Sequence, residues 1–337
     1  MRENSSAITQ TSPALSPGLG WGLLGVLAFS LTVPLTRIAV EGMSPLFIGV
    51  GRAVVAAALA GAALALTRQR LPRGTEWGRL LVVAAGVVLG FPLLTSYALE
   101  SVPAGHCAVV IGLLPAATAV VAVLRGGERP SPRFWRFAAL GVVATVGFVT
   151  AQGAGLGGVG WADLLLLGAV VAAAVGYAEG GLLARSLGAW QTVSWALVVA
   201  VPVTAVLTAV AVAQQPPVAT TGQWAAFAYL AAVSMFLGFV AWYRGLAIGP
   251  IATVSQVQLV QPVLSIGWAT LLLGERITLL TAVGALAVVA CAAGAVRARG
   301  ARSAVPLRAR RPSPAPSPRR RDASAVAAGA GPSADSR

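Results

Sequence analysis

Long apolar stretches alternate along the chain with short connectors that contain glycine, proline or arginine. The apolar region extends from residue 19 to residue 296, and a helix that crosses a bilayer takes about 20 residues. Ten such helices, each with a short connector, fill this region. The pattern therefore predicts spans at 19–39, 45–66, 80–99, 105–124, 134–152, 162–184, 190–213, 223–246, 251–273 and 278–296.

The composition supports a membrane protein and excludes a soluble enzyme. Of 337 residues, 57% are hydrophobic and 10% are charged, and the mean hydropathy is +0.81. Soluble domains have roughly 45–50% apolar and about 25% charged residues. A soluble protein of this length cannot bury so much apolar surface. The expected fold class is an all-α integral membrane protein.

The scarcity of reactive side chains excludes several kinds of site. Cys107 and Cys291 are the only cysteines, which excludes a disulfide scaffold and a cysteine zinc site. A single histidine, His106, leaves no cluster for a metal. The chain has no lysine, so it has no P-loop for ATP. We therefore expect no metal, no cofactor, no catalytic residue and no nucleic-acid partner.

Arginine supplies all 24 basic residues, and its distribution predicts the orientation of the spans. With both ends inside, the inner segments hold 21 arginines, ten of them in the C-terminal tail. The other three are Arg37, Arg52 and Arg276. Inner connectors of membrane proteins carry the excess of positive charge. We predict a multi-pass protein of the plasma membrane with both termini in the cytoplasm.

Prolines and a Gly-Glu-Arg triplet recur at an offset of 147 residues. The matched positions are Pro103 with Pro250, Pro115 with Pro262, and Gly127–Glu128–Arg129 with Gly274–Glu275–Arg276. Each copy would hold five spans, and because five is odd the two copies are inverted relative to each other. Inverted repeats are a common construction of secondary transporters. The alternative is a duplication that is kept only for packing.

The repeat and the composition divide the chain into four parts. We expect a disordered N-terminal segment at 1–18, a first repeat at 19–152 and a second repeat at 162–296. The tail at 297–337 is rich in Arg, Pro and Ser and has no periodicity, so it is expected to be disordered in the cytoplasm. It is interpreted as a solvated tail that helps to fix orientation, or alternatively as a contact for anionic lipid headgroups.

Several motifs in the spans form a characteristic set. They are Ser44–Pro45 followed by Arg52, Tyr97–Ala98–Leu99, Pro115, Gly127–Glu128–Arg129–Pro130, the segment Trp242–Ala247, Gln261–Pro262, Leu273–Gly274–Glu275, and the glycine pair Gly147 and Gly294. As a set, these residues resemble the EamA family of the drug/metabolite transporter superfamily over residues 19–296. The resemblance implies two inverted five-helix repeats, and the family includes exporters of amino acids, metabolites and toxic compounds.

The predicted function is secondary transport across a membrane, without ATP, by alternating access. An exporter of small metabolites, amino acids or drug-like solutes is expected, with the bilayer and a small molecule as partners and a homodimer as one open assembly. The alternatives are a membrane scaffold or receptor without transport, and a membrane-embedded enzyme.

Two charged residues lie deep inside predicted spans, away from the span ends. Arg52 follows Pro45 by seven residues, roughly 10 Å along the helix axis. It either holds an anionic group or a carboxylate in a cavity, or extends to the outer headgroups. Glu179 lies about 9 Å inside the inner edge. It either binds a proton or pairs with Arg185 or Arg244.

Polar side chains in the ninth span complete the candidate cavity. Ser255, Gln258, Pro262 and Ser265 share one face of the helix, and Gln261 flanks it. Polar groups in lipid need partners, so this face should look inward, toward a cavity or toward neighbouring helices. Thr95 and Tyr97 in the third span are expected to complete the lining, and Arg52, Glu179 and the ninth-span face should meet in one space.

The two Gly-Glu pairs are interpreted as structural, and a direct role in binding a ligand is the alternative. Gly127 and Gly274 each end a helix in a left-handed turn. Glu128 and Glu275 are expected near the N-terminus of the helix that follows, where the helix dipole favours a negative charge.

Overall fold

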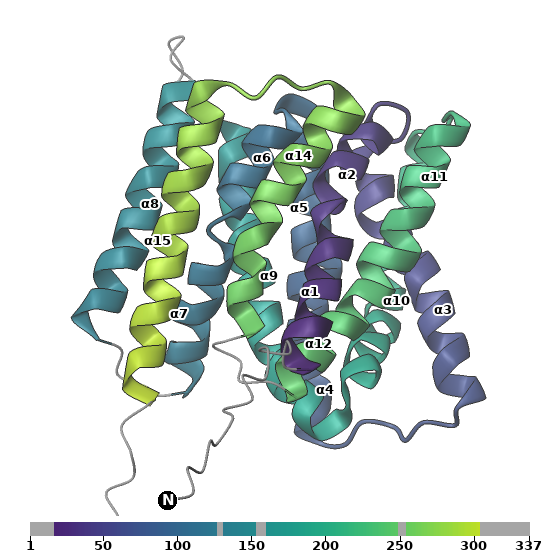
Figure 1. Ribbon diagram of the computed structural model, residues 1–337. Helices are drawn as coiled ribbons and strands as arrows, with labels where there is room; N and C mark the ends of the chain where they lie inside the picture. Colours follow the sequence, from purple (N-terminus) through teal and green to yellow (C-terminus); the bar gives the residue numbers. More distant parts are fainter. Residues whose placement is uncertain (1–16, 127–130, 153–159, 249–253, 304–337) are drawn as a thin grey trace, which may run out of the picture. The chain divides into compact units, whose positions relative to one another are not determined.

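The computed structural model describes residues 17–126, 131–152, 160–248 and 254–303 (Figure 1). Within these ranges all regular secondary structure is helical. The described helices join into ten continuous runs, numbered here in chain order, with five runs in each half of the chain.

The first five runs contain, in order, α1 (Pro17–Ser30) with α2 (Thr32–Val40); η1 (Phe47–Gly51) with α3 (Arg52–Leu66); α4 (Thr75–Val83), η2 (Ala84–Gly90) and α5 (Phe91–Ser101); α6 (Ala104–Ile111) with α7 (Leu114–Gly126); and α8 (Pro132–Gln152). The last five contain α9 (Trp161–Leu187); α10 (Ala189–Gln214); α11 (Thr221–Tyr229), η3 (Leu230–Leu237) and α12 (Gly238–Ile248); η4 (Ser255–Val260) with α14 (Gln261–Leu273); and α15 (Leu279–Ser303). The segments η1, η2 and η3 are π-helical, and η4 is a 3₁₀-helix.

Most of these runs are long and apolar enough to cross a bilayer. Seven candidates in the described residues have at least 18 residues, and three shorter apolar helices lie at Trp135–Phe148, Val257–Leu273 and Leu279–Cys291. The described part of the chain is therefore all-helical, and its apolar helices are those of a multi-pass membrane protein. The positions of the runs follow the apolar stretches closely, because lipid-facing and core-facing residues are both apolar.

The boundaries of both expected disordered segments differ from the prediction. Helix α15 continues to Ser303, whereas the disordered tail was expected to begin at residue 297. Alternating Ala and Arg have high helix propensity, so the helix extends past the end of the apolar stretch. Helix α1 begins at Pro17, inside the segment 1–18 that was expected to be disordered. The rest of the two expected segments, 1–16 and 304–337, lies outside the described residues.

The helix boundaries repeat at the same offset of 147 residues as the sequence motifs. Helix α5 corresponds to α12 and α7 corresponds to α14, with both ends of each pair in register. The π-helical segments η2 and η3 also correspond, to within one residue at their starts. The repeat therefore extends to the irregular segments of the backbone, which composition alone would not reproduce.

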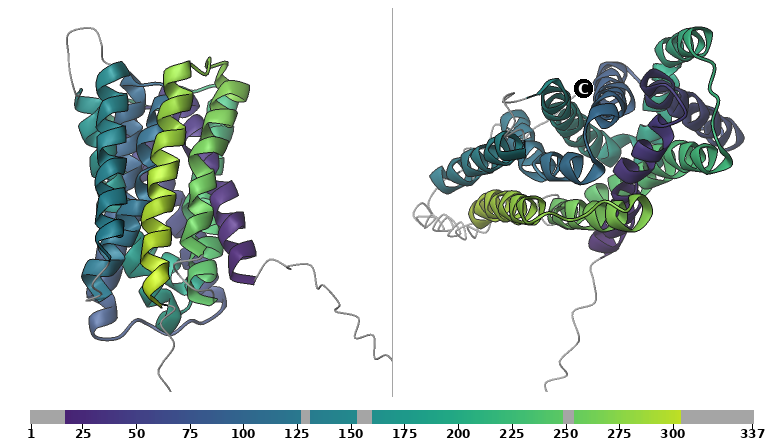
Figure 2. Two further views of the ribbon diagram at one scale, coloured as in Figure 1. Left: turned by 60° about the vertical axis from the view of Figure 1, so that its left-hand side comes forward. Right: turned by 90° about the horizontal axis from the view of Figure 1, so that it is seen from above.

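The packing of the runs is consistent with the repeat. Helix α8 packs along α15, which Figures 1 and 2 both show, and α3 packs along α10; each pair joins corresponding runs of the two halves. Helix α1 packs along α12, and the corresponding pair is α9 with α5. Exchange of the two halves thus leaves these contacts unchanged.

A proline interrupts the first run, and the other half of the chain satisfies the interrupted backbone. Pro34 has no N–H, so the carbonyl of Ser30 loses its helical donor. The Ser265 hydroxyl of α14 donates to this carbonyl at 2.8 Å. The indole N–H of Trp268 donates to the Ser30 hydroxyl at 3.1 Å. The break between α1 and α2 is therefore held by α14.

Glycines allow α1 and α12 to approach closely. A Cβ atom on Gly245 would lie 2.8 Å from the backbone nitrogen of Gly22 and 2.9 Å from the carbonyl oxygen of Gly18. Real side chains do not reach such distances from backbone, so any larger residue at 245 requires a helix to move.

We predict that Gly245→Ala lowers the melting temperature of the purified protein, with a destabilisation of about 1–3 kcal/mol from overpacking. Gly61→Ala is the matched control, since a Cβ on Gly61 meets no atom within 4 Å. That control should leave stability unchanged or raise it slightly, because alanine favours the helix over glycine by roughly 0.5–1 kcal/mol. Equal melting temperatures for the two variants would contradict the close approach of α1 and α12.

Candidate functional site

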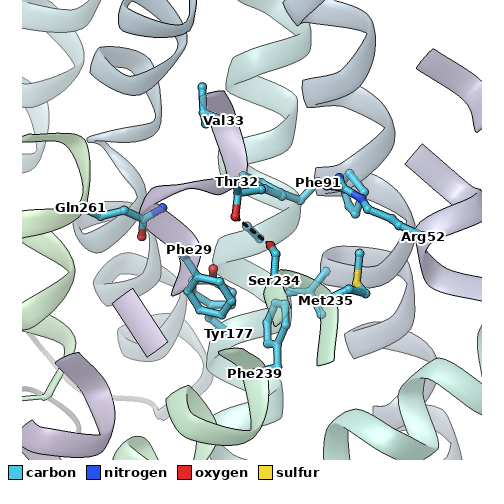
Figure 3. Close-up of a pocket in the computed structure, with 13 residues that line it drawn as sticks. Phe29, Thr32, Val33, Arg52, Phe91, Tyr177, Ser234, Met235, Phe239 and Gln261 are labelled. Atoms are coloured by element: carbon cyan, nitrogen blue, oxygen red, sulfur yellow. Dashed lines mark hydrogen bonds between the residues drawn. The ribbon is translucent and has the colours of Figure 1, made fainter. Parts of the chain in front are cut away.

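A cavity lies where the two halves of the helical unit meet (Figure 3). It has about 430 Å³ of empty space, including its open mouth. Its walls come from runs one, two and three of the first half and from runs six, eight and nine of the second. The lining residues are Phe29, Thr32, Val33, Arg52, Val87, Phe91, Pro92, Ala173, Tyr177, Ser234, Met235, Phe239 and Gln261.

Several helices are interrupted or irregular at the positions where they line the cavity. Several lining residues are the first residue after an interruption or lie inside a π-helical segment: Thr32 begins α2, Arg52 begins α3, Phe91 begins α5, Gln261 begins α14, and Ser234 and Met235 lie in η3. Irregular turns of this kind are frequent at functional sites. Broken helices also surround the binding sites of many secondary transporters.

Arg52 is buried in this cavity without a counterion. Its exposed fraction is 1%, and its Nε and Nη2 atoms have no hydrogen-bond partner among the described residues. The ion pairs of the described chain involve other residues. An isolated charge inside a membrane is costly and usually marks a functional position. Of the two interpretations from sequence, the structure favours a cavity residue over one that extends to the headgroups.

The lining also contains neutral polar groups. Thr32 and Ser234 share a hydrogen bond of 2.7 Å between their hydroxyls across the cavity. The Oε1 atom of Gln261 is buried and has no partner in the described residues. Figure 3 shows Gln261 and Arg52 on opposite sides, with the Thr32–Ser234 pair between them. The polar groups therefore come from both halves of the chain.

Aromatic rings form one wall of the cavity. The ring centroids of Phe29 and Phe239 are 4.9 Å apart, and those of Tyr177 and Phe239 are 5.8 Å apart. All three rings lie below the Thr32–Ser234 pair in Figure 3. Edge and face contacts of this kind fix the rings in place, so this wall is apolar and preformed.

The sequence predicted that Glu179 and Arg52 meet in one space. The structure places Glu179 outside the cavity that Arg52 lines. Its carboxylate accepts hydrogen bonds from Arg79 Nε and from Arg125 Nη2, the latter at 2.7 Å. The three residues line a separate pocket between α4, α7 and α9. The expected alternative partner Arg244 instead lies over the ring of Trp21, at 5.1 Å from its centroid. Glu179 is therefore part of an ion-pair cluster, defined here as Arg79, Glu179 and Arg125.

Thr95 and Tyr97 do not line the cavity. Thr95 is buried, and its hydroxyl donates to the Phe91 carbonyl of its own helix at 2.7 Å. Tyr97 is 41% exposed on the other side of α5. From this run Val87, Phe91 and Pro92 reach the cavity. Thr95 lies on the same face as Phe91, but one helical turn further along the run.

The ninth-span face is divided among several roles. Gln258 is buried, and both atoms of its amide lack a partner in the described residues, but it does not line the cavity. Ser265 is committed to the Ser30 carbonyl, and Pro262 is buried at the start of α14. The side chain of Ser255 lies outside the described part of the chain. Gln261, which was expected to flank this face, is the member that lines the cavity.

The Gly-Glu pair at the end of α14 joins two runs. Gly274 adopts the expected left-handed conformation, with φ of 66°. The carboxylate of Glu275 accepts hydrogen bonds from the backbone N–H groups of Ala104 and Gly105, at 2.7 and 2.8 Å. It therefore caps α6 in the first half and not α15, the helix that follows it. Pro115 is buried at the start of α7, and Gly127 and Glu128 lie outside the described residues.

Sequence reasoning missed several lining residues. Phe29, Tyr177 and Phe239 look like ordinary apolar positions in a chain that is apolar throughout. Thr32 could have been found, because Pro34 marks a helix break close to it. Ser234 carries no such signal, since only the packing of η3 against the first run brings it to Thr32.

The model of the EamA-like transporter family matches residues 16–150 and 160–297, in two copies that cover most of the chain. The chain belongs to the EamA-like transporter family. A Bacillus subtilis (strain 168) protein named Uncharacterized transporter YdeK is 45% identical over 280 residues, which cover 82% of this chain and 97% of that protein. A solved crystal structure matches with a TM-score of 0.60 and 21% identity, over 84% of this chain and 99% of that one. The match to the crystal structure supports the fold, and the family and the relative identify a membrane transporter.

For this EamA-like chain we predict that Glu275→Ala destabilises the junction between α14 and α6. The change leaves two N–H groups at the start of α6 without an acceptor, which costs about 0.5–2 kcal/mol for a lost cap. Thermal unfolding in detergent should show a lower melting temperature for Glu275→Ala than for Glu275→Gln, which retains one acceptor oxygen.

Glu41→Ala is the matched control for this cap. Glu41 follows the end of α2 and is exposed, so its removal should change the melting temperature little. A Glu275→Ala protein as stable as the Glu41→Ala protein would show that the cap contributes nothing.

Proposed function

We propose that this EamA-like chain is a secondary transporter that exports small solutes by alternating access through the cavity between its two repeats. One observation carries the proposal: a buried, unpartnered arginine lines a cavity to which both halves contribute polar groups. A repeat that is kept only for packing would gain nothing from such a charge, which is costly inside a membrane.

The proposed topology has ten membrane spans and both termini in the cytoplasm of the plasma membrane. The arginine distribution and the run boundaries support it, because ten runs of this kind return the chain to the side where it began. The two five-span repeats then have opposite orientations, as in inverted-repeat transporters.

The ion-pair cluster is proposed to close the inner side of the cavity. Arg79 and Arg125 belong to the first half and Glu179 to the second, so the cluster links the repeats. In the proposed topology all three residues lie toward the cytoplasm. Opening toward the cytoplasm would therefore require these ion pairs to separate, whereas the outer side has a different set of contacts around Glu275.

Transport itself is tested with purified protein in liposomes. Vesicles are loaded with a mixture of amino acids and small organic acids, and efflux is followed by mass spectrometry against protein-free vesicles. We expect at least one solute to leave faster from the protein-containing vesicles. Identical efflux from both kinds of vesicle, for every class of solute, would overturn the proposed function.

The topology is tested with reporter fusions at two positions. We predict that a reporter after Gly157 lies outside the cell and a reporter after Arg310 lies inside, because an odd number of spans separates them. Alkaline phosphatase and green fluorescent protein fusions report these sides directly. Both reporters on one side would contradict the five-span repeat, and exchanged sides would contradict the orientation.

For the ion-pair cluster we predict that Glu179→Gln increases access to the cavity from the cytoplasmic side. A neutral amide cannot hold two guanidinium groups, so the inner contacts should weaken. The measurement is maleimide labelling of Ala173→Cys, a buried cavity position, in inside-out vesicles of a protein without Cys107 and Cys291.

The control variant is Glu76→Gln, which breaks the exposed pair of Glu76 with Arg70 at 3.1 Å. This pair lies away from the cavity, and exposed ion pairs contribute little to stability. Labelling at 173 should rise at least several-fold in Glu179→Gln and stay unchanged in Glu76→Gln. A rise in both variants, or in neither, would show that the cluster does not close the inner side.

A further inference from the structure

The charge balance of the cavity is the feature that points beyond transport in general. Among the thirteen lining residues, Arg52 is the one that carries a charge. Its guanidinium cannot lose its proton under ordinary conditions. The lining therefore has a formal charge of +1, and no described residue compensates it.

The described carboxylates are either engaged elsewhere or, like Glu41 and Glu100, exposed at the ends of their runs. Glu179 belongs to the ion-pair cluster. Asp163 accepts a hydrogen bond from the backbone of Gly160 and lies 2.7 Å from His106 Nε2. Glu275 caps α6. The missing negative charge must then come from a molecule that enters the cavity.

A guanidinium selects the shape as well as the sign of its partner. Its N–H groups form a planar fork that matches the two oxygens of a carboxylate. Nε and Nη2 of Arg52, which are buried and have no partner in the described residues, lie on the same edge of this fork. One such edge neutralises one carboxylate, whereas an ion with two negative charges would leave an excess charge in an apolar site.

The other lining residues indicate which kind of molecular body fits beside the carboxylate. Phe29, Tyr177 and Phe239 provide an aromatic surface that favours a flat or apolar group. Gln261, on the far side from Arg52, and the Thr32–Ser234 pair between them offer hydrogen bonds to a neutral polar group. An amine would meet no carboxylate in this lining and would be repelled by the guanidinium.

We propose that the cavity binds small organic monoanions, with a single carboxylate held by Arg52 and an apolar or aromatic body against Phe29, Tyr177 and Phe239. The inference rests on the proposed function, because it names the class of solute that this cavity carries. Zwitterions are weaker ligands than monoanions here, since they leave the charge of the lining at +1.

Three probes with one body and different head groups test the proposal. Phenylacetate, phenylacetamide and 2-phenylethylamine share a benzyl group and carry charges of −1, 0 and +1 at neutral pH. Binding to the purified full-length protein is measured by calorimetry and by the shift in melting temperature. We expect phenylacetate to bind roughly tenfold or more tightly than the amide, which corresponds to about 1.4 kcal/mol, and the amine to bind most weakly.

Variants then assign the preference to Arg52. Arg52→Gln should remove the difference between phenylacetate and phenylacetamide, and Arg52→Lys should keep part of it, because an ammonium keeps the charge but loses the fork. Arg276→Gln is the control, since Arg276 is an exposed arginine outside the cavity. The probe series on the unmodified protein keeps the test decisive even if Arg52→Gln does not fold.

Equal binding of the acid and the amide to the unmodified protein, or tighter binding of the amine, would overturn the proposal. Unchanged discrimination in a folded Arg52→Gln protein would overturn it too. Efflux of the three probes from liposomes, corrected with protein-free vesicles for passive leak, separates this failure from failure of the transport function. Flux of the amine alone would refute the monoanion class and support transport. Phenylacetate binding without flux would support the monoanion class and refute transport.

Discussion

Backbone hydrogen bonding inside an apolar bundle is the constraint on which this structure depends. Every interruption of a helix at membrane depth frees carbonyl or N–H groups that lipid cannot satisfy. At Pro34 the freed Ser30 carbonyl is satisfied by Ser265 from the other half of the chain. Such partners must be protein or solvent, so interrupted helices have to face the interior. This explains why the irregular points of several runs gather around one cavity.

Charged side chains also need partners inside the bundle. The chain has few carboxylates, and three of the described ones near the ends of the runs, Asp163, Glu179 and Glu275, are engaged by histidine, by arginine and by a helix N-terminus. These contacts tie the two halves together at the edges. Arg52 at the centre is the exception, and its isolation coincides with the cavity and with a π-helical segment directly before it. Pairing at the edges and an unpaired charge at the centre are what a binding site between two repeats requires.

The sequence predicted the runs and the repeat well, because both depend on patterns that apolar residues, prolines and glycines display directly. It also singled out Arg52, a charge within an apolar stretch, which the structure places in the lining of the cavity. It could not identify the partners of Glu179, because Arg79 and Arg125 lie on other runs, far away in the chain. In uniformly apolar helices no pattern distinguishes the lipid side from the core, which is why Tyr97 was misplaced and Tyr177 was overlooked. The prediction that Glu275 caps the helix that follows it was wrong for a related reason. The helix N-terminus nearest to Glu275 in space is that of α6, which is not the next helix in the sequence.

The uncompensated charge of Arg52 has a consequence for energetics. An empty cavity carries +1, whereas a cavity that holds a monoanion is electrically neutral. In an alternating carrier the loaded step would then be indifferent to the membrane voltage, while the return of the empty site would move positive charge through the field. Movement of one elementary charge across the whole membrane changes the free energy by about 2.3 kcal/mol per 100 mV. With the interior of the cell negative, the voltage would draw the empty site back to the cytoplasmic side. Export of an anion would thus be driven by the membrane potential, and it would register as a net outward flow of negative charge in electrical recordings.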